Sequence, residues 1–455
     1  MSGGCFLSLL LLACLGQCTG EKVMLIVLGG FRWDYFNIHT YDVDGFSKVF
    51  EKGVKADHLI PSFPTLTYPN IYSLVTGLYP ENHGVVGDEM WDPEMKRKFS
   101  KGDNPEYLKP YWWDMGEPVW VTAAKQGKTS YMFNWPGCDA TIRSLQPTFC
   151  VPHSDVKPDL TPDLEKFMNS KREGLELLKN GSADFVGLYY EVTDYVTHLY
   201  SPGSQESKGL SRWLDNEFDK LIHDIDNDEL EYDVNVLVAS DHGVADISKK
   251  KVVNITAVLV PEDVDHIVGH GAIVSVWPKT DKVQQVYDKL KDYNDNVAVY
   301  LKDDIPDSWH YRDNIRVAPV TLVASLGWMI ATPEQGLPKS DRGRRFRSYE
   351  GYDNKEVRMR ATFFGFGPNL KRGYTLPAIE NVNLYQLMCR ILRITAAPNN
   401  GTWSNIEEAF IKVPYRPLIT WKRTFTYGPV LAAVLVAAII YYVKFRKHSD
   451  KHKEV

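Results

Sequence analysis

Runs of consecutive apolar residues alternate along the chain with segments whose apolar residues follow helical spacing. The runs are strand-length and rich in β-branched and aromatic residues. They predict buried strands at Val23–Leu28, Phe185–Tyr190, Val234–Ala239 and Ala272–Trp277, and the spaced segments predict helices at Leu164–Asn180 and Leu210–Ile225. This alternation favours an α/β fold with a mostly parallel central sheet and helices on both faces. Because no Ser/Gly-rich or charge-rich linker divides residues 21–424, we expect them to form one large domain with insertions.

Residues 1–20 form a separate apolar segment at the start of the chain. Its centre runs from Phe6 to Leu15 and is followed by small or polar residues. This order is typical of a cleavable secretory signal peptide. A short N-terminal core strand is the alternative, and it is less favoured because no charged residue occurs before Glu21.

Residues 425–443 form a second apolar run, 19 residues long and without a charge. That length is sufficient for one transmembrane helix. The stronger cluster of basic residues follows it, at Lys444, Arg446 and Lys447, which predicts that residues 444–455 are a cytoplasmic tail. We therefore expect a single-pass type I protein of the cell membrane with an extracellular domain. A cleaved GPI signal is the alternative, but such signals end in apolar residues and this chain ends in polar ones.

The net charge of the chain bears on its partners, and its sequons bear on the secretory route. The chain has 52 basic and 58 acidic residues, a net charge of −6, which argues against a nucleic-acid polymer as partner. The secretory route would make three Asn-x-Ser/Thr sequons available for glycosylation. These are Asn180, Asn254 and Asn400.

Three cysteines follow the predicted signal peptide. Cys138 and Cys150 can close a short loop in an oxidising compartment. Cys389 is left over, and its apolar surroundings favour a buried thiol over an intermolecular bridge.

Polar residues with metal-binding potential follow the predicted strands. Asp241 and His242 come directly after one strand, and they offer a carboxylate and an imidazole, which zinc accepts. Asp194 and His198 are four residues apart, so that one helix face can present both to one ion. Hydrogen-bonded loop or surface residues are the alternative for each pair taken singly.

Another pair with the same spacing is His266 and His270. They form a rival metal site by spacing alone. A polar loop before the strand from Ala272 is the favoured interpretation, because no third ligand is spaced with them.

Thr67 precedes a helical pattern over Ile71–Leu78, and Pro69 suits a first helical turn. The hydroxyl would lie at the positive N-terminal end of a helix, where phosphate is favoured, and a metal could activate it as a nucleophile. An N-cap threonine is the alternative.

Together these segments resemble the ectonucleotide pyrophosphatase/phosphodiesterase family of the alkaline-phosphatase superfamily along nearly all of residues 21–424. Within the family, several stretches are most similar to the choline-specific glycerophosphodiester phosphodiesterases. These are Phe63–Gly77, Trp112-Trp113, Glu117-Pro118, Trp135–Cys138, Pro147–Cys150 and Asn399–Trp403.

The resemblance implies an alkaline-phosphatase-like sandwich with two zinc ions. One ion would be held by Asp194, His198 and a later histidine, and the other by an early aspartate, Thr67, Asp241 and His242. Thr67 would attack phosphorus and form a covalent intermediate. Paired metals of this kind stabilise the attacking and leaving oxygens.

The chain departs from the family pattern at three of these positions. The early aspartate is Gly29, which has no ligand to offer, and the late histidine is Glu350, which can still bind zinc. The asparagine that contacts the phosphoryl oxygen is Asp88, whose charge opposes the anionic transition state unless Asp88 moves to the metal in place of the residue missing at Gly29. We therefore expect one or two zinc ions, and either weakened activity or none.

Choline is recognised by aromatic faces and a nearby carboxylate. The resemblance offers Tyr68, Tyr72 and Tyr189 as walls and Glu191 as the anion. The expected function is a membrane-anchored ecto-phosphodiesterase that hydrolyses small choline-containing phosphodiesters such as glycerophosphocholine or lysophospholipid. The alternatives are a pseudoenzyme that binds a phosphodiester headgroup or a protein partner without cleavage, and a nucleotide pyrophosphatase.

Overall fold

The computed structural model describes residues 21–38, 44–100, 105–333 and 346–411. The predicted signal peptide, transmembrane helix and cytoplasmic tail all lie outside these residues. Within them, no helix has both the length and the apolar sequence that a membrane span requires. The predicted domain bounds of 21–424 stay a prediction, because residues 412–455 are not described.

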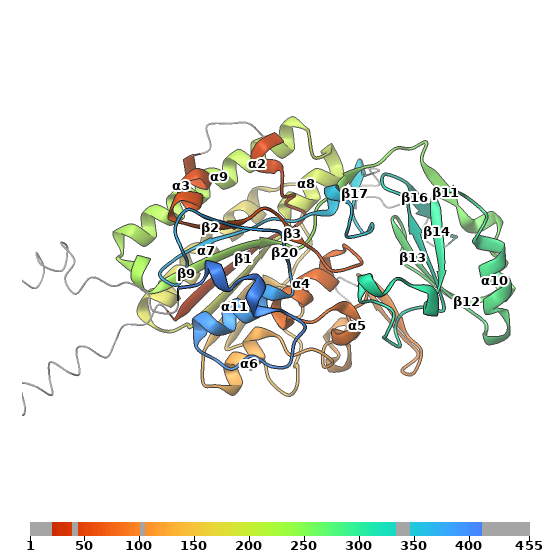
Figure 1. The fold of residues 1–455 in the computed structure, drawn as a ribbon, viewed down its shortest axis with the longest axis horizontal. Coiled ribbons are helices and arrows are strands. Elements are labelled where there is room, and N and C mark those ends of the chain that lie inside the picture. The colour runs from red at the N-terminus through yellow and green to blue at the C-terminus, as the bar shows by residue number, and fades with distance from the viewer. Residues whose placement is uncertain (1–20, 39–43, 101–104, 334–345, 412–455) are drawn as a thin grey trace, which may run out of the picture. The chain divides into compact units, whose positions relative to one another are not determined.

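An eight-stranded sheet forms the centre of the described structure (Figure 1). Its order is β19 (Tyr374–Leu376), β2 (Gly53–Ala56), β18 (Phe363–Phe366), β9 (Val234–Ser240), β1 (Lys22–Leu28), β8 (Phe185–Tyr190), β6 (Ser130–Trp135) and β7 (Phe149–Pro152). Only β18 runs antiparallel to its neighbours, β2 and β9. This confirms the mostly parallel sheet that the apolar runs predict.

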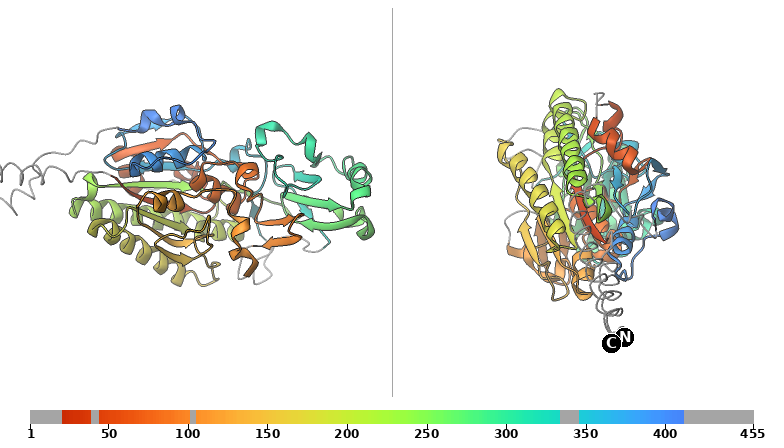
Figure 2. Two further views of the ribbon diagram at one scale, coloured as in Figure 1. Left: turned by 90° about the horizontal axis from the view of Figure 1, so that it is seen from below. Right: turned by 90° about the vertical axis from the view of Figure 1, so that its left-hand side faces the viewer.

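Helices cover both faces of this sheet, as expected when the strands are apolar on both sides. The side chains of β1 alternate: Val23, Leu25 and Val27 enter one core, and Met24 and Ile26 enter the other. The two faces appear in Figures 1 and 2. One core contains residues of α4 (Thr67–Thr76), α6 (Val119–Lys125) and α11 (Asn383–Leu392), and the other contains residues of α3 (Asp44–Lys52), α7 (Thr161–Asn180), α8 (Val192–Tyr200) and α9 (Gln205–Asn227).

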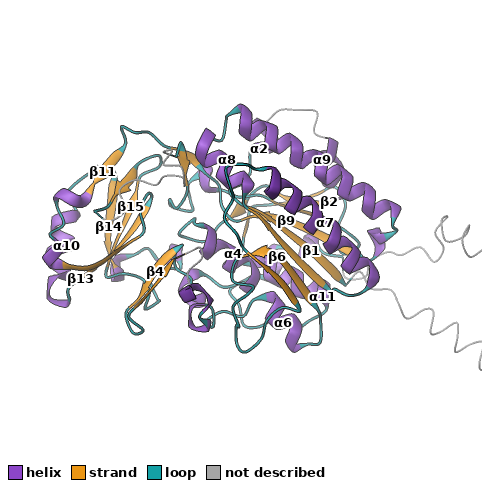
Figure 3. Ribbon diagram, turned by 180° about the vertical axis from the view of Figure 1, so that it is seen from behind, coloured by secondary structure: helices purple, strands orange, loops and turns teal. Residues whose placement is uncertain are grey.

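A second sheet lies outside the central one and is antiparallel throughout (Figure 3). Its order is β12 (Val264–Val268), β13 (Ile273–Pro278), β15 (Val320–Ala324) and β14 (Val297–Leu301), and α10 (Val283–Leu290) packs on it. The predicted strand at Ala272–Trp277 is β13, so it does not belong to the central sheet. Its apolar run indicates burial but not which sheet it joins, and the partly exposed β12 and β14 have no comparable run.

Several short elements besides the 3₁₀ helices belong to the described structure. They are α2 (Tyr35–Ile38), α5 (Pro80–His83) and four strand pairs: β3 (Leu59–Ile60) with β20 (Ile379–Glu380), β4 (Glu89–Asp92) with β5 (Arg97–Ser100), β10 (Ala245–Asp246) with β17 (Ser348–Tyr349), and β11 (Val252–Asn254) with β16 (Met329–Ala331).

The cysteines form the pairing that the sequence predicts. Cys138 and Cys150 are joined by a disulfide, which ties β7 to the loop after β6. Cys389 is free, buried in α11, and its burial raises the pKa of the thiol to about 12. The predicted buried thiol is therefore the state of Cys389 in this structure.

Candidate active site

Three parallel neighbours of the central sheet end side by side. Leu28 of β1 is paired with Tyr190 of β8 and with Ser240 of β9. The residues that follow these strands therefore meet at one edge, as in other open α/β sheets. Asp194 and His198 reach this edge from α8, which begins directly after β8.

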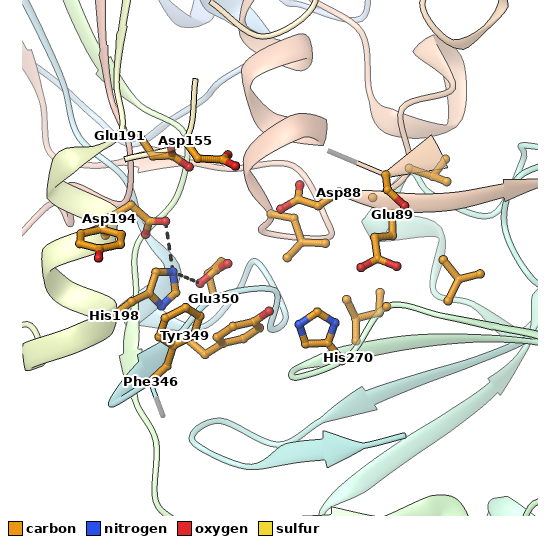
Figure 4. A pocket seen from close by; sticks show the side chains of 18 of the residues that line it. Asp88, Glu89, Asp155, Glu191, Asp194, His198, His270, Phe346, Tyr349 and Glu350 are labelled. Atoms are coloured by element: carbon orange, nitrogen blue, oxygen red, sulfur yellow. Dashed lines mark hydrogen bonds and ion pairs between the residues drawn. The ribbon is translucent and has the colours of Figure 1, made fainter. Parts of the chain in front are cut away.

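Asp194, His198 and Glu350 form the first group of ligand-type side chains, which we term the open cluster (Figure 4). Their ligand atoms lie within 4.8 Å of one another. His198 Nε2 is 3.1 Å from Asp194 Oδ2 and 3.1 Å from Glu350 Oε2. His198 Nδ1 donates to the carbonyl of Ser348 at 2.8 Å, which orients Nε2 toward the two carboxylates.

The open cluster fits a divalent ion. All three side chains are buried, and Asp194 Oδ1 is buried without a hydrogen-bond partner among the described residues. Burial opposes a charge on His198, but Asp194 and Glu350 outweigh it and raise the pKa of His198 well above its usual value. Two carboxylates and an imidazole are ligands that zinc accepts, and an ion would relieve the concentration of buried charge.

Thr67, Asp241 and His242 form the second group, which we term the closed cluster. Thr67 Oγ1 lies 3.1 Å from His242 Nε2, and His242 Nε2 lies 3.6 Å from Asp241 Oδ2. His242 Nδ1 donates to the carbonyl of Gly243 at 2.9 Å. Asp241 and His242 are 0% exposed and Thr67 is 4% exposed.

Burial and mutual attraction set the charges of the closed cluster. Burial raises the pKa of Asp241 to about 6, even though His242 opposes the shift. Burial alone would lower the pKa of His242, but the nearby carboxylates, Asp241 first, raise it to about 9. Asp241 and His242 therefore form a buried pair in which each side chain favours the charged form of the other.

Thr67 is the first residue of α4, and Leu66 occupies the N-cap position without a side-chain hydrogen bond. The N-cap alternative for Thr67 is therefore not what the structure shows. The helix ends at Thr76, with Gly77 in the left-handed conformation, close to the predicted end.

Asp88 caps this helix from another segment. Its Oδ1 accepts a hydrogen bond from the backbone N–H of Tyr68 at 2.9 Å. A carboxylate is favoured at this position by the partial positive charge of the helix end. Among the described residues, Asp88 does not join Asp241 and His242 in a ligand cluster, so it does not supply the ligand that Gly29 lacks.

A pocket of about 430 Å³ opens at this edge, between the central sheet and the second sheet (Figure 4). The open cluster lines it, whereas the residues of the closed cluster are not among its lining residues. Six carboxylates line the pocket: Asp88, Glu89, Asp155, Glu191, Asp194 and Glu350. Aromatic side chains line it as well, from Tyr195, Tyr311, Phe346 and Tyr349.

Comparison with known proteins places this chain in a family. Residues 23–353 match the family described as Type I phosphodiesterase / nucleotide pyrophosphatase. The chain belongs to this family. This confirms the family-level resemblance that the sequence motifs indicate.

Several phosphodiesterase relatives match most of their own length. The chain is 33% identical to the bis(5'-adenosyl)-triphosphatase enpp4 of Xenopus laevis over 405 residues, which is 87% of this chain and 85% of that protein. It is 31% identical to ectonucleotide pyrophosphatase/phosphodiesterase family member 5 of Homo sapiens over 397 residues, 86% of this chain and 78% of that protein.

Solved structures agree with this assignment. The chain matches murine ectonucleotide pyrophosphatase / phosphodiesterase 5 with a TM-score of 0.76 and 30% identity, covering 86% of this chain and 100% of that one. An inactive threonine-to-alanine variant of the murine protein, in complex with AMP, matches with a TM-score of 0.75, 29% identity and the same coverage.

The predicted choline-binding residues lie in different surroundings. Tyr68, Tyr72 and Tyr189 are each 2% exposed and belong to the hydrophobic core. The Tyr72 hydroxyl donates to the carbonyl of Trp113 at 2.6 Å. Glu191 lies in the pocket wall. The structure therefore brings the predicted anion to the pocket but not the three predicted aromatic walls.

Sequence reasoning missed a second group of ligand-type side chains at the pocket. His153, Asp155 and Glu191 have ligand atoms within 4.8 Å of one another, and His153 Nε2 is 3.0 Å from Glu191 Oε2. His153 and Asp155 follow β7, so the rule about strand ends applies to them. The signal is weak because the residues of β7 are partly or fully exposed.

The other predicted sites are placed as follows. His266 lies within β12, where it contacts Trp91 with ring centroids 3.8 Å apart, so it does not belong to the expected loop. His270 lies in the β12–β13 loop and lines the pocket. Neither belongs to a ligand cluster of the described residues.

The three sequon asparagines, Asn180, Asn254 and Asn400, are exposed, and their glycosylation stays a prediction.

Proposed function

We propose that the chain hydrolyses small phosphodiesters with metal assistance and with Thr67 as the nucleophile. The observation that carries the proposal is the position of Thr67 Oγ1, at the start of α4 and 3.1 Å from His242 Nε2. A helix N-terminus favours the negatively charged phosphoryl group. A hydroxyl within hydrogen-bond reach of a base is the arrangement of an activated nucleophile.

The residues of the closed cluster would handle the proton. Because the Gly243 carbonyl can only accept, His242 Nδ1 carries a proton, and Nε2 of the neutral imidazole is left to take the proton of Thr67. Asp241 lies beside the imidazole and would stabilise the resulting charge.

The open cluster would hold the metal ion. Asp194, His198 and Glu350 are its ligands, and a bound ion would polarise the phosphoryl oxygen. Binding there would also neutralise carboxylates that raise the pKa of His242. The pKa of His242 would then fall, which favours its neutral imidazole. The inactive threonine variant of the murine relative supports a threonine nucleophile.

For the substrate we propose a choline-bearing phosphodiester. Outside the open cluster the pocket presents Asp88, Glu89, Asp155 and Glu191, with Lys157 as the only lysine or arginine among its lining residues. This charge suits a zwitterionic substrate better than a polyanion. The side chains of Phe346 and Tyr349 offer the aromatic contacts that a quaternary ammonium needs, in place of the three core tyrosines.

Two other functions each have an observation in their favour. The names of the relatives, a bis(5'-adenosyl)-triphosphatase and a family member 5 bound to AMP, favour a nucleotide substrate. The hydrogen bond between Asp88 and the Tyr68 amide favours a pseudoenzyme, because a carboxylate occupies a donor that a phosphoryl oxygen could use.

The proposal includes a type I membrane protein with its phosphodiesterase domain outside the cell. The disulfide and the three exposed sequons support passage through the secretory route. Surface labelling of intact cells that express the full-length chain tests this. Labelling of residues 21–411 without permeabilisation supports it, and labelling only after permeabilisation contradicts it.

Hydrolysis by the purified full-length chain with added zinc tests the function. Thr67→Ala should abolish turnover, and Thr67→Ser should retain part of it because a hydroxyl remains. Glycerophosphocholine and bis(5'-adenosyl) triphosphate should be compared at equal concentration. Turnover of bis(5'-adenosyl) triphosphate alone would change the proposed substrate from a choline ester to a nucleotide. Equal background rates for wild type and Thr67→Ala would support the pseudoenzyme.

Glu191→Gln tests the choline part of the proposal separately. It should raise KM for glycerophosphocholine by about tenfold, because one charge contact to the quaternary ammonium is lost. The value of kcat should stay nearly unchanged. The matched control is Glu89→Gln at another part of the wall. An equal KM effect in the two variants would indicate a general charge effect and not a headgroup contact.

A further inference from the structure

Gly29 stands where the closed cluster lacks a ligand, and its surroundings show why no larger residue fits. Its φ is not in the left-handed region, unlike that of Gly30 at 61°, so the backbone would accept any L-residue. A Cβ at Gly29 would, however, lie 2.8 Å from the hydroxyl oxygen of Tyr189. The Tyr189 hydroxyl is therefore the closest obstacle to a larger residue at position 29, followed by Glu191 Cα at 3.3 Å and Asp194 Cβ at 3.4 Å.

Tyr189 places this hydroxyl from β8, the strand next to β1. The hydroxyl oxygen is 3.5 Å from Asp241 Oδ2, a long hydrogen bond in which the phenol donates. A phenol is protonated at neutral pH, so this hydroxyl acts as a neutral donor. A neutral donor thus faces Asp241 from the space that an acidic side chain at position 29 would enter.

The other ligand atoms of the closed cluster have protein partners. Asp241 Oδ1 accepts the N–H groups of Gly30 and His242, each at 2.9 Å. His242 uses Nδ1 on Gly243 and Nε2 on Thr67. Only Asp241 and His242 are strong ligands, and protein metal sites use three or four. The closed cluster does not fit an ion, in contrast to the open cluster, where Asp194 Oδ1 has no hydrogen-bond partner in the part of the chain that the structure describes.

We propose that, of the open and closed clusters, only the open cluster binds a divalent ion, and that the Tyr189 hydroxyl occupies the place of the acidic ligand that Gly29 lacks in the closed cluster. The inference rests on the proposed function for the presence of an ion at the open cluster. In the closed cluster, internal hydrogen bonds then do what a second ion would do: they hold Asp241 and His242 in place beside Thr67.

Zinc stoichiometry tests the proposal without an activity assay. The purified full-length chain is stripped with a chelator, reloaded with excess zinc, desalted and analysed by elemental mass spectrometry. Wild type should retain one zinc ion per chain, His242→Gln should also retain one, and Glu350→Gln should retain none. Two ions in wild type, falling to one in His242→Gln, would overturn the proposal, as would no bound zinc in wild type.

A gain-of-site variant tests the role of Tyr189. Tyr189→Phe removes the hydroxyl, and Gly29→Asp then adds a carboxylate into the freed space. The double variant should bind two ions, and Tyr189→Phe alone should bind one. A folded double variant that binds one ion overturns the assignment to Tyr189. If the double variant does not fold, the wild-type and His242→Gln counts still decide the number of ions.

These counts are independent of turnover. One zinc ion in a chain without phosphodiesterase activity leaves the inference standing and rejects the proposed function. Activity together with two ions does the reverse.

Discussion

The open and closed clusters lie at the same sheet edge and use the same kinds of side chain, yet they differ in what surrounds them. Asp194, His198 and Glu350 line the pocket, and Asp194 Oδ1 has no hydrogen-bond partner among the described residues. Asp241 and His242 are fully buried and bonded to backbone groups, to Thr67 and to Tyr189. Ligand identity alone therefore does not make a metal site. We infer that it also requires an accessible ligand atom without a competing partner, as Asp194 Oδ1 is among the described residues.

The largest expected effect is the loss of the ion from the open cluster. Glu350→Ala removes one of three ligands, so zinc affinity and activity should fall by more than about 100-fold, the upper range for loss of an outer partner of a metal ligand. Glu350→His should retain the ion, because imidazole is also a zinc ligand. Zinc titration by calorimetry measures both. Glu89→Gln, in the same wall, is the control, and an equal loss there would contradict the ligand role of Glu350.

Asp88→Asn, at the start of the helix that carries Thr67, should have the next largest effect. The amide oxygen can still accept from Tyr68 N–H, while the amide nitrogen adds a donor where a carboxylate repelled the phosphoryl group. We expect kcat to rise by about 100-fold, the effect of one such donor, with zinc content unchanged. Steady-state kinetics of the variant and of Asp155→Asn as a control measure this. A lower kcat in Asp88→Asn would show that the carboxylate assists the reaction.

His83, which contacts the helix that carries Thr67, makes the free energy of unfolding depend on pH. Its Nδ1 accepts from Val85 N–H, and its Nε2 lies 3.0 Å from Ser73 Oγ of α4. Burial lowers the pKa of His83 to about 3, so between pH 6.5 and 3 the unfolded chain binds a proton that the folded chain does not. Its contribution is therefore constant above pH 6.5, and the free energy of unfolding falls by about 1.4 kcal/mol per pH unit below it.

Urea unfolding at pH 7.5, 6.5 and 5.5 in chelator measures this slope. His83→Gln should remove that part of the pH dependence, whatever its effect on stability at pH 7.5. His223→Gln, at an exposed position of α9, is the matched control. A slope that stays the same in His83→Gln would show that other groups account for the acid sensitivity.

The sequence predicts the parts of this site that depend on local pattern. Strands β1, β8 and β9 follow from apolar runs because both faces of the sheet are covered, and the i, i+4 spacing of Asp194 and His198 follows from helix geometry. The pairing of β13 with partly exposed strands has no local signal. Glu350 enters only through the family resemblance, because its approach to His198 depends on the tertiary fold.

The same distinction explains the closed cluster. The sequence predicts its residues from the strand ends and from the helix start at Thr67. It does not predict the hydrogen bonds that the polar atoms of the cluster make with one another and with the backbone. The 2.8 Å distance between a Cβ at Gly29 and the Tyr189 hydroxyl joins residues of two strands, and the bond between Asp88 and Tyr68 N–H joins a loop to a helix. Such contacts depend on side-chain directions that one sequence does not reveal.

The smallest expected effect belongs to Tyr189→Phe, which separates the space that the hydroxyl fills from the bond that it makes. The bond to Asp241 Oδ2 is 3.5 Å long, whereas Asp241 Oδ1 keeps two backbone donors at 2.9 Å. Loss of the hydroxyl should therefore destabilise the chain by at most about 1 kcal/mol, measured by urea unfolding. Tyr68→Phe, in the same core, is the control for loss of a buried phenol. A loss well above the control would mean that the hydroxyl holds Asp241 in place, whereas a loss equal to it would mean that the hydroxyl acts at Gly29 chiefly by occupying space.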